Sequence, residues 1–201
     1  WPRLGAMSVL GNGLSGMGNY EDALVVQEAE LSMMERLGDS EHNILTTSGN
    51  FAVTYSSLGR FTEALDTRRD VYSRRLKLSG EDHGDTLAAA GNYALSLMDL
   101  KRFREAKSLL RRTLPVARRS LGDNHEVMLR MRWYYGRVLF LDDSATLNDL
   151  RESATTFEET ARTARRVLGG AHPLTAKIEH NLQNARDALH AREETPQEEK
   201  G

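Results

Sequence analysis

The sequence of 201 residues contains no cysteine, which excludes disulfide bonds and any metal or nucleophile chemistry based on a thiolate. It has only four prolines, so few of its secondary-structure elements are interrupted. No apolar run approaches the roughly 18 residues that a membrane span needs. Aromatic residues make up 6% and hydrophobic residues 39% of the chain, so it can fold but has little apolar material for a thick core.

The charges nearly cancel, with a net charge of -2. The last eleven residues, 191–201, hold four glutamates against one arginine and one lysine, and we expect residues 193–201 to form an acidic, flexible tail. The remaining chain is neutral, which argues against bulk electrostatic binding of nucleic acid or of an anionic membrane. Because the sequence starts with Trp1, we expect a fragment of a longer chain. We also expect the protein to be cytoplasmic.

Short segments recur along the chain at nearly constant spacing. Residues 49–52, Gly-Asn-Phe-Ala, return at 91–94 as Gly-Asn-Tyr-Ala, 42 positions later. The block Gly-Arg-Phe-Thr-Glu-Ala-Leu at 59–65 has counterparts 41 residues before it and 42 residues after it. A third signature ends in histidines that are 41, 42 and 47 residues apart, namely His42, His83, His125 and His172. This spacing indicates an array of repeated units, with an insertion of about five residues within 141–149.

Each unit is predicted to contain two helices. Phe51, Ala52 and Tyr55 have the i, i+1, i+4 spacing of a helical apolar stripe. Gly59 then ends that helix, because glycine adopts the left-handed conformation at little cost. Glycine with Asp or Asn breaks the chain again before the next unit. The first helices are expected at 5–17, 43–58, 84–100 and 126–141, the second helices at 20–37, 61–78, 103–120 and 149–167, and a capping helix at 173–192.

A helical hairpin of this size cannot bury its apolar face alone, so stacking on the next hairpin must bury it and the array is a solenoid. Small residues fall in repeated columns that would let helices approach closely. These are Ala52, Ala94 and Gly136 on the first helices, and Ala23, Ala64, Ala106 and Ser153 on the second helices. We place the solenoid at 1–192, with units at about 4–40, 41–82, 83–124 and 125–171 and a cap at 172–192.

The 42-residue spacing, the Gly-Arg-Phe-Thr-Glu-Ala block and the Leu-Gly-x-x-His linker resemble the tetratricopeptide repeat family, in particular its kinesin light chain type. The resemblance covers about 4–191 and implies an all-α fold, a right-handed α-solenoid of helix-turn-helix repeats whose first helices line a concave groove. The linker His-Pro of that type occurs only at His172, and Tyr134 stands where earlier units have Asn50 and Asn92. We infer no motor role, because the coiled coil of light chains is missing from this sequence.

Residues spaced i, i+4, i+7 on the first helices would face this groove. Asn50, Asn92 and Asn181 then form a column of amides, which both donate and accept and can clamp the backbone of an extended peptide. Basic and aromatic residues, a combination that interfaces favour, join them in the C-terminal half: Arg130, Trp133, Tyr134, Arg137 and Lys177. The resemblance implies that such residues hold peptides, often acidic ones. Alternatively, the asparagines only order neighbouring helices through hydrogen bonds.

Three other patterns favour structural roles. The basic run at 101–119 has only one aromatic, Phe103, among its cations, which favours a solvated face over nucleic acid or lipid. Pro115 should kink its helix. The four repeated histidines lie in different units, roughly 10 Å apart, so they cannot share one metal ion and instead start helices. Gly-x-Gly-x-x-Gly at 11–16 formally matches a dinucleotide fingerprint, but the expected second strand is missing. We expect a frayed first helix there.

We therefore predict a non-enzymatic scaffold that binds a partner protein or peptide, acidic or aromatic-acidic, in the groove. Arg130 and Arg137 would anchor charge, and no cofactor, metal, nucleic acid or membrane is expected. The alternative is a structural self-assembly module whose terminal repeats stack end to end into a weak homo-oligomer. An enzyme is disfavoured, because no acid–base pair or nucleophile has an evident partner.

Overall fold

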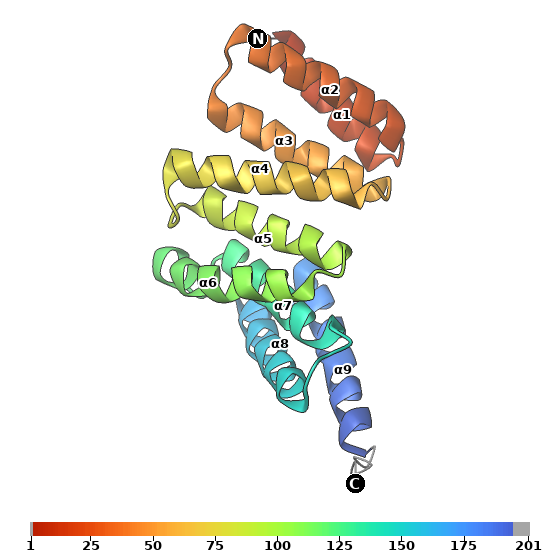
Figure 1. The fold of residues 1–201 in the computed structure, drawn as a ribbon, viewed down its shortest axis with the longest axis vertical. Helices are drawn as coiled ribbons and strands as arrows, with labels where there is room; N and C mark the ends of the chain where they lie inside the picture. Colours follow the sequence, from red (N-terminus) through yellow and green to blue (C-terminus); the bar gives the residue numbers. More distant parts are fainter. Residues whose placement is uncertain (1, 195–201) are drawn as a thin grey trace. The chain divides into compact units, whose positions relative to one another are not determined.

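The computed structural model describes residues 2–194, and the regular structure of these residues is entirely helical (Figure 1). Nine helices follow one another in this described range. They are α1 (Pro2–Gly16), α2 (Tyr20–Leu37), α3 (Glu41–Ser57), α4 (Phe61–Ser79), α5 (Gly84–Asp99), α6 (Phe103–Leu121), α7 (Glu126–Leu141), α8 (Leu147–Leu168) and α9 (Pro173–Glu194). The all-α class is confirmed, and each helix begins and ends within a few residues of its predicted position.

The chain divides into two compact units, Trp1–Leu100 and Lys101–Gly201. In the first unit, α1 packs on α2, α2 on α3, α3 on α4 and α4 on α5. In the second unit, α6 packs on α7, α7 on α8 and α8 on α9, and α7 also contacts α9. The boundary between the units lies inside the repeat predicted at 83–124. Of the tail predicted at 193–201, residues 193 and 194 end α9, and the others lie outside the described residues.

Small side chains at the repeated positions bring neighbouring helices together. The alanines of the predicted columns are at most 1% exposed: Ala52 and Ala94 in first helices, and Ala23, Ala64 and Ala106 in second helices. Ser153 holds the same place in α8 and is fully buried. Its hydroxyl donates a hydrogen bond of 2.8 Å to the carbonyl of Gly136. The predicted packing role of these columns is therefore confirmed.

Gly136 lies directly against Phe157, whose side chain is fully buried in the core of the second unit. A methyl group placed at Gly136 would lie 2.6 to 2.9 Å from three carbons of that ring. These distances are far shorter than the separation of about 3.5–4.0 Å at which carbon atoms attract one another. The missing side chain at Gly136 thus makes the room that the phenyl ring occupies.

The first helix is intact, so the prediction of a frayed helix near 5–17 is wrong. Gly11 is buried in α1, and a methyl group added there would meet the Cγ atom of Gln27 at 3.0 Å. Leu4 is also buried and packs in a cluster with Met34 of α2. Packing on α2 therefore offsets the helix-destabilising effect of the glycines. No strand precedes Gly11 in the described residues, which removes the dinucleotide-binding interpretation.

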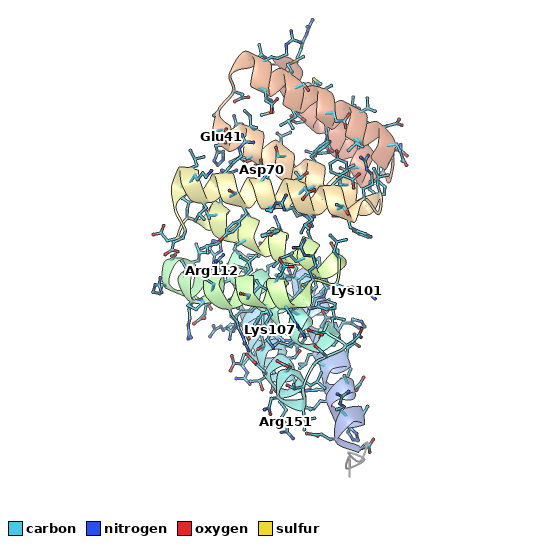
Figure 2. All side chains as sticks on the ribbon, in the orientation of Figure 1. Glu41, Asp70, Lys101, Lys107, Arg112 and Arg151 are labelled. Atoms are coloured by element: carbon cyan, nitrogen blue, oxygen red, sulfur yellow. The ribbon has the colours of Figure 1, made fainter. Side chains whose placement is uncertain are left out.

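Glycine ends α3 as predicted. The helix stops at Ser57, and Gly59 has a φ of 73° in the left-handed region. The equivalent position between α5 and α6 is Lys101, which is labelled in Figure 2, and its φ is 57°. A residue with a Cβ atom is strained in this conformation. The turn after α5 thus keeps the left-handed geometry although lysine replaces glycine there. Further along, α6 continues through Pro115.

The insertion in the last interval is shared between a loop and a helix. Five residues connect α7 to α8, compared with three between α3 and α4. The helix α8 has 22 residues, compared with 19 for α4 and α6. Within the connecting loop, the carboxylate of Asp142 accepts hydrogen bonds from the backbone N–H and the hydroxyl of Ser144, at 2.9 and 2.7 Å. These bonds give the longer loop a defined turn.

A capping box fixes the start of α8. Thr146 Oγ1 accepts a hydrogen bond of 3.1 Å from the backbone N–H of Asp149, and Asp149 Oδ2 accepts one of 3.1 Å from the backbone N–H of Thr146. Asp149 also forms an ion pair with Lys107, which lies on α6 and is labelled in Figure 2. The hydrogen bond from Lys107, helped by those from Thr146, lowers the pKa of the Asp149 carboxyl. One side chain thus caps α8 and ties it to α6.

The contact between Gly136 and Phe157 predicts opposite effects for two glycine-to-alanine changes. Gly136→Ala should lower the free energy of unfolding by about 1–3 kcal/mol, because the methyl group overpacks the core. Gly49→Ala should raise it by up to about 1 kcal/mol, because nothing lies within 4 Å of the added methyl group in α3 and alanine is the better helix former. Chemical denaturation measures both. Equal effects of the two changes would contradict the close approach.

The interactions of Asp149 predict that the stability difference between the wild-type protein and Asp149→Asn depends on pH. Asp149→Asn should lower the free energy of unfolding at neutral pH by about 1–2 kcal/mol, through the weakened cap and the lost ion pair. Because folding lowers the pKa of Asp149, its stabilising effect is complete above the unfolded value of about 3.9 and disappears as the pH falls through the folded value. Denaturation curves of both proteins over this range should therefore converge in acid. A constant difference would exclude a role for the charge.

Candidate peptide-binding surface

Two cationic side chains lie over one indole ring in the second unit. Trp133 is on α7 and is half-buried. The guanidinium carbon of Arg137 lies 5.2 Å from the centre of its ring, and the ammonium of Lys177, on α9, lies 5.9 Å from it. Both distances are within the cation–π range. The predicted residues Trp133, Arg137 and Lys177 are therefore brought together by α7 and α9.

A hydrogen bond fixes the orientation of the indole. Trp133 Nε1 donates to Oδ1 of Asn181 at 2.6 Å, so Asn181 joins the same group. The inner edge of Trp133 packs against the core cluster that contains Leu129 and Ile178. The ring is thus held by the core, by an amide and by two cations. We call Trp133, Arg137, Lys177 and Asn181 the indole cluster.

Tyr134 does not offer aromatic surface. It is only 5% exposed, and its ring lies 5.1 Å from the ring of Trp133, centre to centre. The outer face of α7 therefore follows Arg130, Trp133 and Arg137, spaced i, i+3, i+7, and not the predicted i, i+4, i+7 positions. A sequence signal was present, because Tyr134 replaces the asparagine of earlier units, and a large ring in place of an amide favours burial. Arg130 is part of this face but pairs with Glu126.

The two predicted asparagines of the first unit, Asn50 and Asn92, differ from Asn181 in their hydrogen bonding. Asn50, on α3, is exposed, and Asn92, on α5, is half-buried. Neither side chain has a hydrogen-bond partner among residues 2–194. Hydrogen bonding between helices, the structural alternative, therefore explains Asn181, which binds Trp133 across α7 and α9, but not Asn50 or Asn92. Their amides are open to a ligand.

Much of the basic run on α6 is already matched by acidic groups. Lys107 pairs with Asp149, Arg111 lies 3.5 Å from Glu152, and Arg118 lies 3.3 Å from Asp123. Such pairing reduces the positive potential that this part of α6 presents. This agrees with the interpretation of the run as a solvated face.

Tyr135 of α7 links this network to the core. The side chain of Arg111 donates through Nε to the Tyr135 hydroxyl at 2.9 Å, and the hydroxyl donates to Glu152 at 2.6 Å. Burial, together with the hydrogen bond to Glu152, raises the pKa of Tyr135. The phenol therefore stays neutral and serves as a bridge between α6 and α8.

Three of the repeated histidines cap helices. The Nδ1 atoms of His83, His125 and His172 each accept a hydrogen bond of 3.2 Å from a backbone N–H two residues on. His42 instead lies in the first turn of α3, with Nδ1 2.8 Å from a guanidinium nitrogen of Arg75. The described residues contain no group of three or more acidic or histidine side chains that could hold a metal ion. None of the helices in residues 2–194 combines the length and apolar character of a membrane span.

The tetratricopeptide repeat family matches residues 3–77 and again residues 86–126, which together make up more than half of the chain. The chain belongs to the tetratricopeptide repeat family. Its nine helices in the described range form the helical repeats of that family. A search of the curated proteins found no match.

Solved structures of the same fold support this assignment. The nearly identical TPR-like repeats of a Podosopora anserina protein described as a kinesin light chain share 21% identity and a TM-score of 0.74, with 96% of this chain and 89% of that chain covered. A variant of those repeats gives the same identity and coverage and a TM-score of 0.76. BtubC (BKLC) from P. vanneervenii shares 14% identity and a TM-score of 0.63, with 96% and 83% covered. At these identities, the likeness concerns the fold alone.

Proposed function

We propose that the second unit binds an acidic peptide segment of a partner protein through the indole cluster. Tetratricopeptide repeats generally act as protein-interaction scaffolds, so a binding role is the starting expectation. The observation that supports the acidic specificity is Lys177, whose ammonium has no carboxylate partner among residues 2–194. Lys107, Arg111 and Arg118 of α6, in contrast, each have a carboxylate partner. Lys177 and Arg137 thus present positive charge beside an aromatic face.

The geometry suggests how such a segment is held. Carboxylates of the peptide pair with Lys177 and Arg137, and an aromatic or aliphatic side chain packs on the exposed part of Trp133. Asn181 uses its oxygen for Trp133, which leaves its NH₂ group to donate to a peptide carbonyl. In the first unit, taken by itself, Asn50 and Asn92 are proposed as backbone clamps for a peptide bound to that unit. Arg130 assists as a charge anchor only after it exchanges Glu126 for the peptide.

The protein that we propose is a cytoplasmic, non-enzymatic scaffold. No reaction is assigned to any residue of the indole cluster. Binding alone is expected, with selectivity from charge and from one aromatic contact.

Charge reversal at the indole cluster tests the proposal. Arg137→Glu and Lys177→Glu should each weaken the binding of a short polyglutamate peptide at least about ten-fold, because each change replaces attraction by repulsion. Isothermal titration calorimetry measures the affinity, and helical circular dichroism should stay unchanged. Arg112→Glu is the matched control, because Arg112 is exposed on α6 and undergoes the same change of charge (Figure 2). Unchanged affinity in the first two variants, or an equal loss in the control, would refute the assignment.

The alternative role, self-assembly, is favoured by exposed apolar side chains near the start of the chain. Val9 and Leu10 of α1 are 75% and 52% exposed, Met17 is 71% exposed and Val25 of α2 is 65% exposed. A second copy stacked on this first hairpin would bury them, as each repeat is buried by its neighbour.

Light scattering over a range of concentrations separates the two roles. If copies stack through the first hairpin, the mean mass should rise with concentration, and the double change Val9→Glu with Leu10→Glu should prevent that rise by placing charges in an apolar contact. A mass that stays monomeric at every concentration would remove self-assembly and leave peptide binding unaffected.

A further inference from the structure

A hollow of about 290 Å³ opens between α6, α7 and α8 in the second unit. Its apolar part is formed by Leu114 and Pro115 of α6 and by Met128 and Tyr135 of α7. This volume is just below the range of about 300–1,000 Å³ for ligand pockets. The hollow therefore has room for one side chain and not for a large ligand.

The preceding repeat fills the equivalent place with its own aromatic ring. In the first unit, the ring of Tyr72 stacks on that of Tyr93, with ring centres 6.1 Å apart and an angle of 26° between the planes. The 42-residue repeat makes Leu114 the counterpart of Tyr72, and Tyr135 the counterpart of Tyr93. Tyr135 has thus kept its place while its stacking partner has become leucine, and both residues line the hollow.

Two arginines also differ from the residues at the same positions of the preceding repeat. Arg132 stands at the position of the fully buried Ala90, and Arg118 at the position of Leu76. Both arginines line the hollow together with Asp123, which lies 3.3 Å from Arg118 and 3.8 Å from Arg132. The guanidinium of Arg132 also pairs with Glu159 at 2.6 Å. Guanidinium groups at the edge of an apolar hollow favour an electron-rich ring, because cations are attracted to its face.

The hollow is separate from the indole cluster. Its residues on α7 are Met128, Arg132 and Tyr135, whereas the outer face of α7 follows Arg130, Trp133 and Arg137. The two sets are offset by about two residues, which is roughly 200° around a helix. They therefore lie on opposite sides of α7, and occupation of one does not depend on the other.

We propose that this hollow is a second binding site, which takes the side chain of a tyrosine from a partner protein. The partner's ring takes the place that Tyr72 has in the preceding repeat, against Tyr135 and over Leu114. Arg118 and Arg132 border the ring as cations. Arg118 is 70% exposed, so its ion pair with Asp123 is weak and can yield to the ligand.

The test uses p-cresol, the side-chain analogue of tyrosine, on the complete chain. Titration followed by the NMR signals of backbone amides should give saturable shifts confined to α6, α7 and α8. Leu114→Tyr restores the ring of the preceding repeat and should weaken p-cresol binding at least about ten-fold, because the site is then filled. The matched control Leu114→Ile keeps an aliphatic side chain of the same size and should retain binding. The Tm of Leu114→Tyr should rise as its ring packs on Tyr135.

A saturated analogue, 4-methylcyclohexanol, tests the aromatic specificity and should bind more weakly than p-cresol. Equal binding of the two compounds would overturn the aromatic assignment. Wild-type protein without saturable shifts, shifts that map to other helices, or unchanged binding in Leu114→Tyr would each overturn the site itself. The wild-type map stands by itself if a variant fails to fold.

Discussion

Two helices joined by a short turn leave an apolar face that only a neighbouring helix can cover. In this chain, the covering depends on close approach, and close approach depends on small residues at fixed places in every repeat. The columns of alanine, glycine and serine are buried throughout the described residues. Gly136 is the extreme case, because the ring of Phe157 fills the space that a side chain would need. The positions of the side chains proposed to bind a peptide follow from this spacing.

The contact of α7 with α9 brings together the side chains of the indole cluster. These two helices flank α8, and their contact places Lys177 and Asn181 beside Trp133. The tryptophan is thereby anchored through its N–H and its inner edge, while two cations lie over its ring. An indole fixed in this way loses little conformational freedom when a ligand arrives, and such preorganisation favours affinity.

Much of the fold could be predicted because the same sequence features recur at the same positions of each repeat. Gly59 and the histidine spacing locate helix ends, and the small-residue columns locate the contacts between helices. The wrong predictions concern residues whose role depends on a neighbour that is distant in the sequence. Gly11 was expected to weaken α1, but it allows Gln27 to pack closely. Tyr134 was placed by analogy with Asn50 and Asn92, although a large ring at that position turns inward. The division of the chain into two compact units leaves no mark in the periodicity.

The substitutions between repeats carry information that the repeat itself does not. Leu114 in place of Tyr72, Lys101 in place of Gly59 and Tyr134 in place of asparagine all break the pattern without breaking the helices. Within each unit, helices pack mainly on the next helix along the chain, so most native contacts join residues close in sequence. Low contact order of this kind allows rapid folding that can start at any hairpin and spread to its neighbours. An end hairpin can then open while the rest of its unit remains native, which makes the ends the expected starting points for hydrogen exchange and proteolysis.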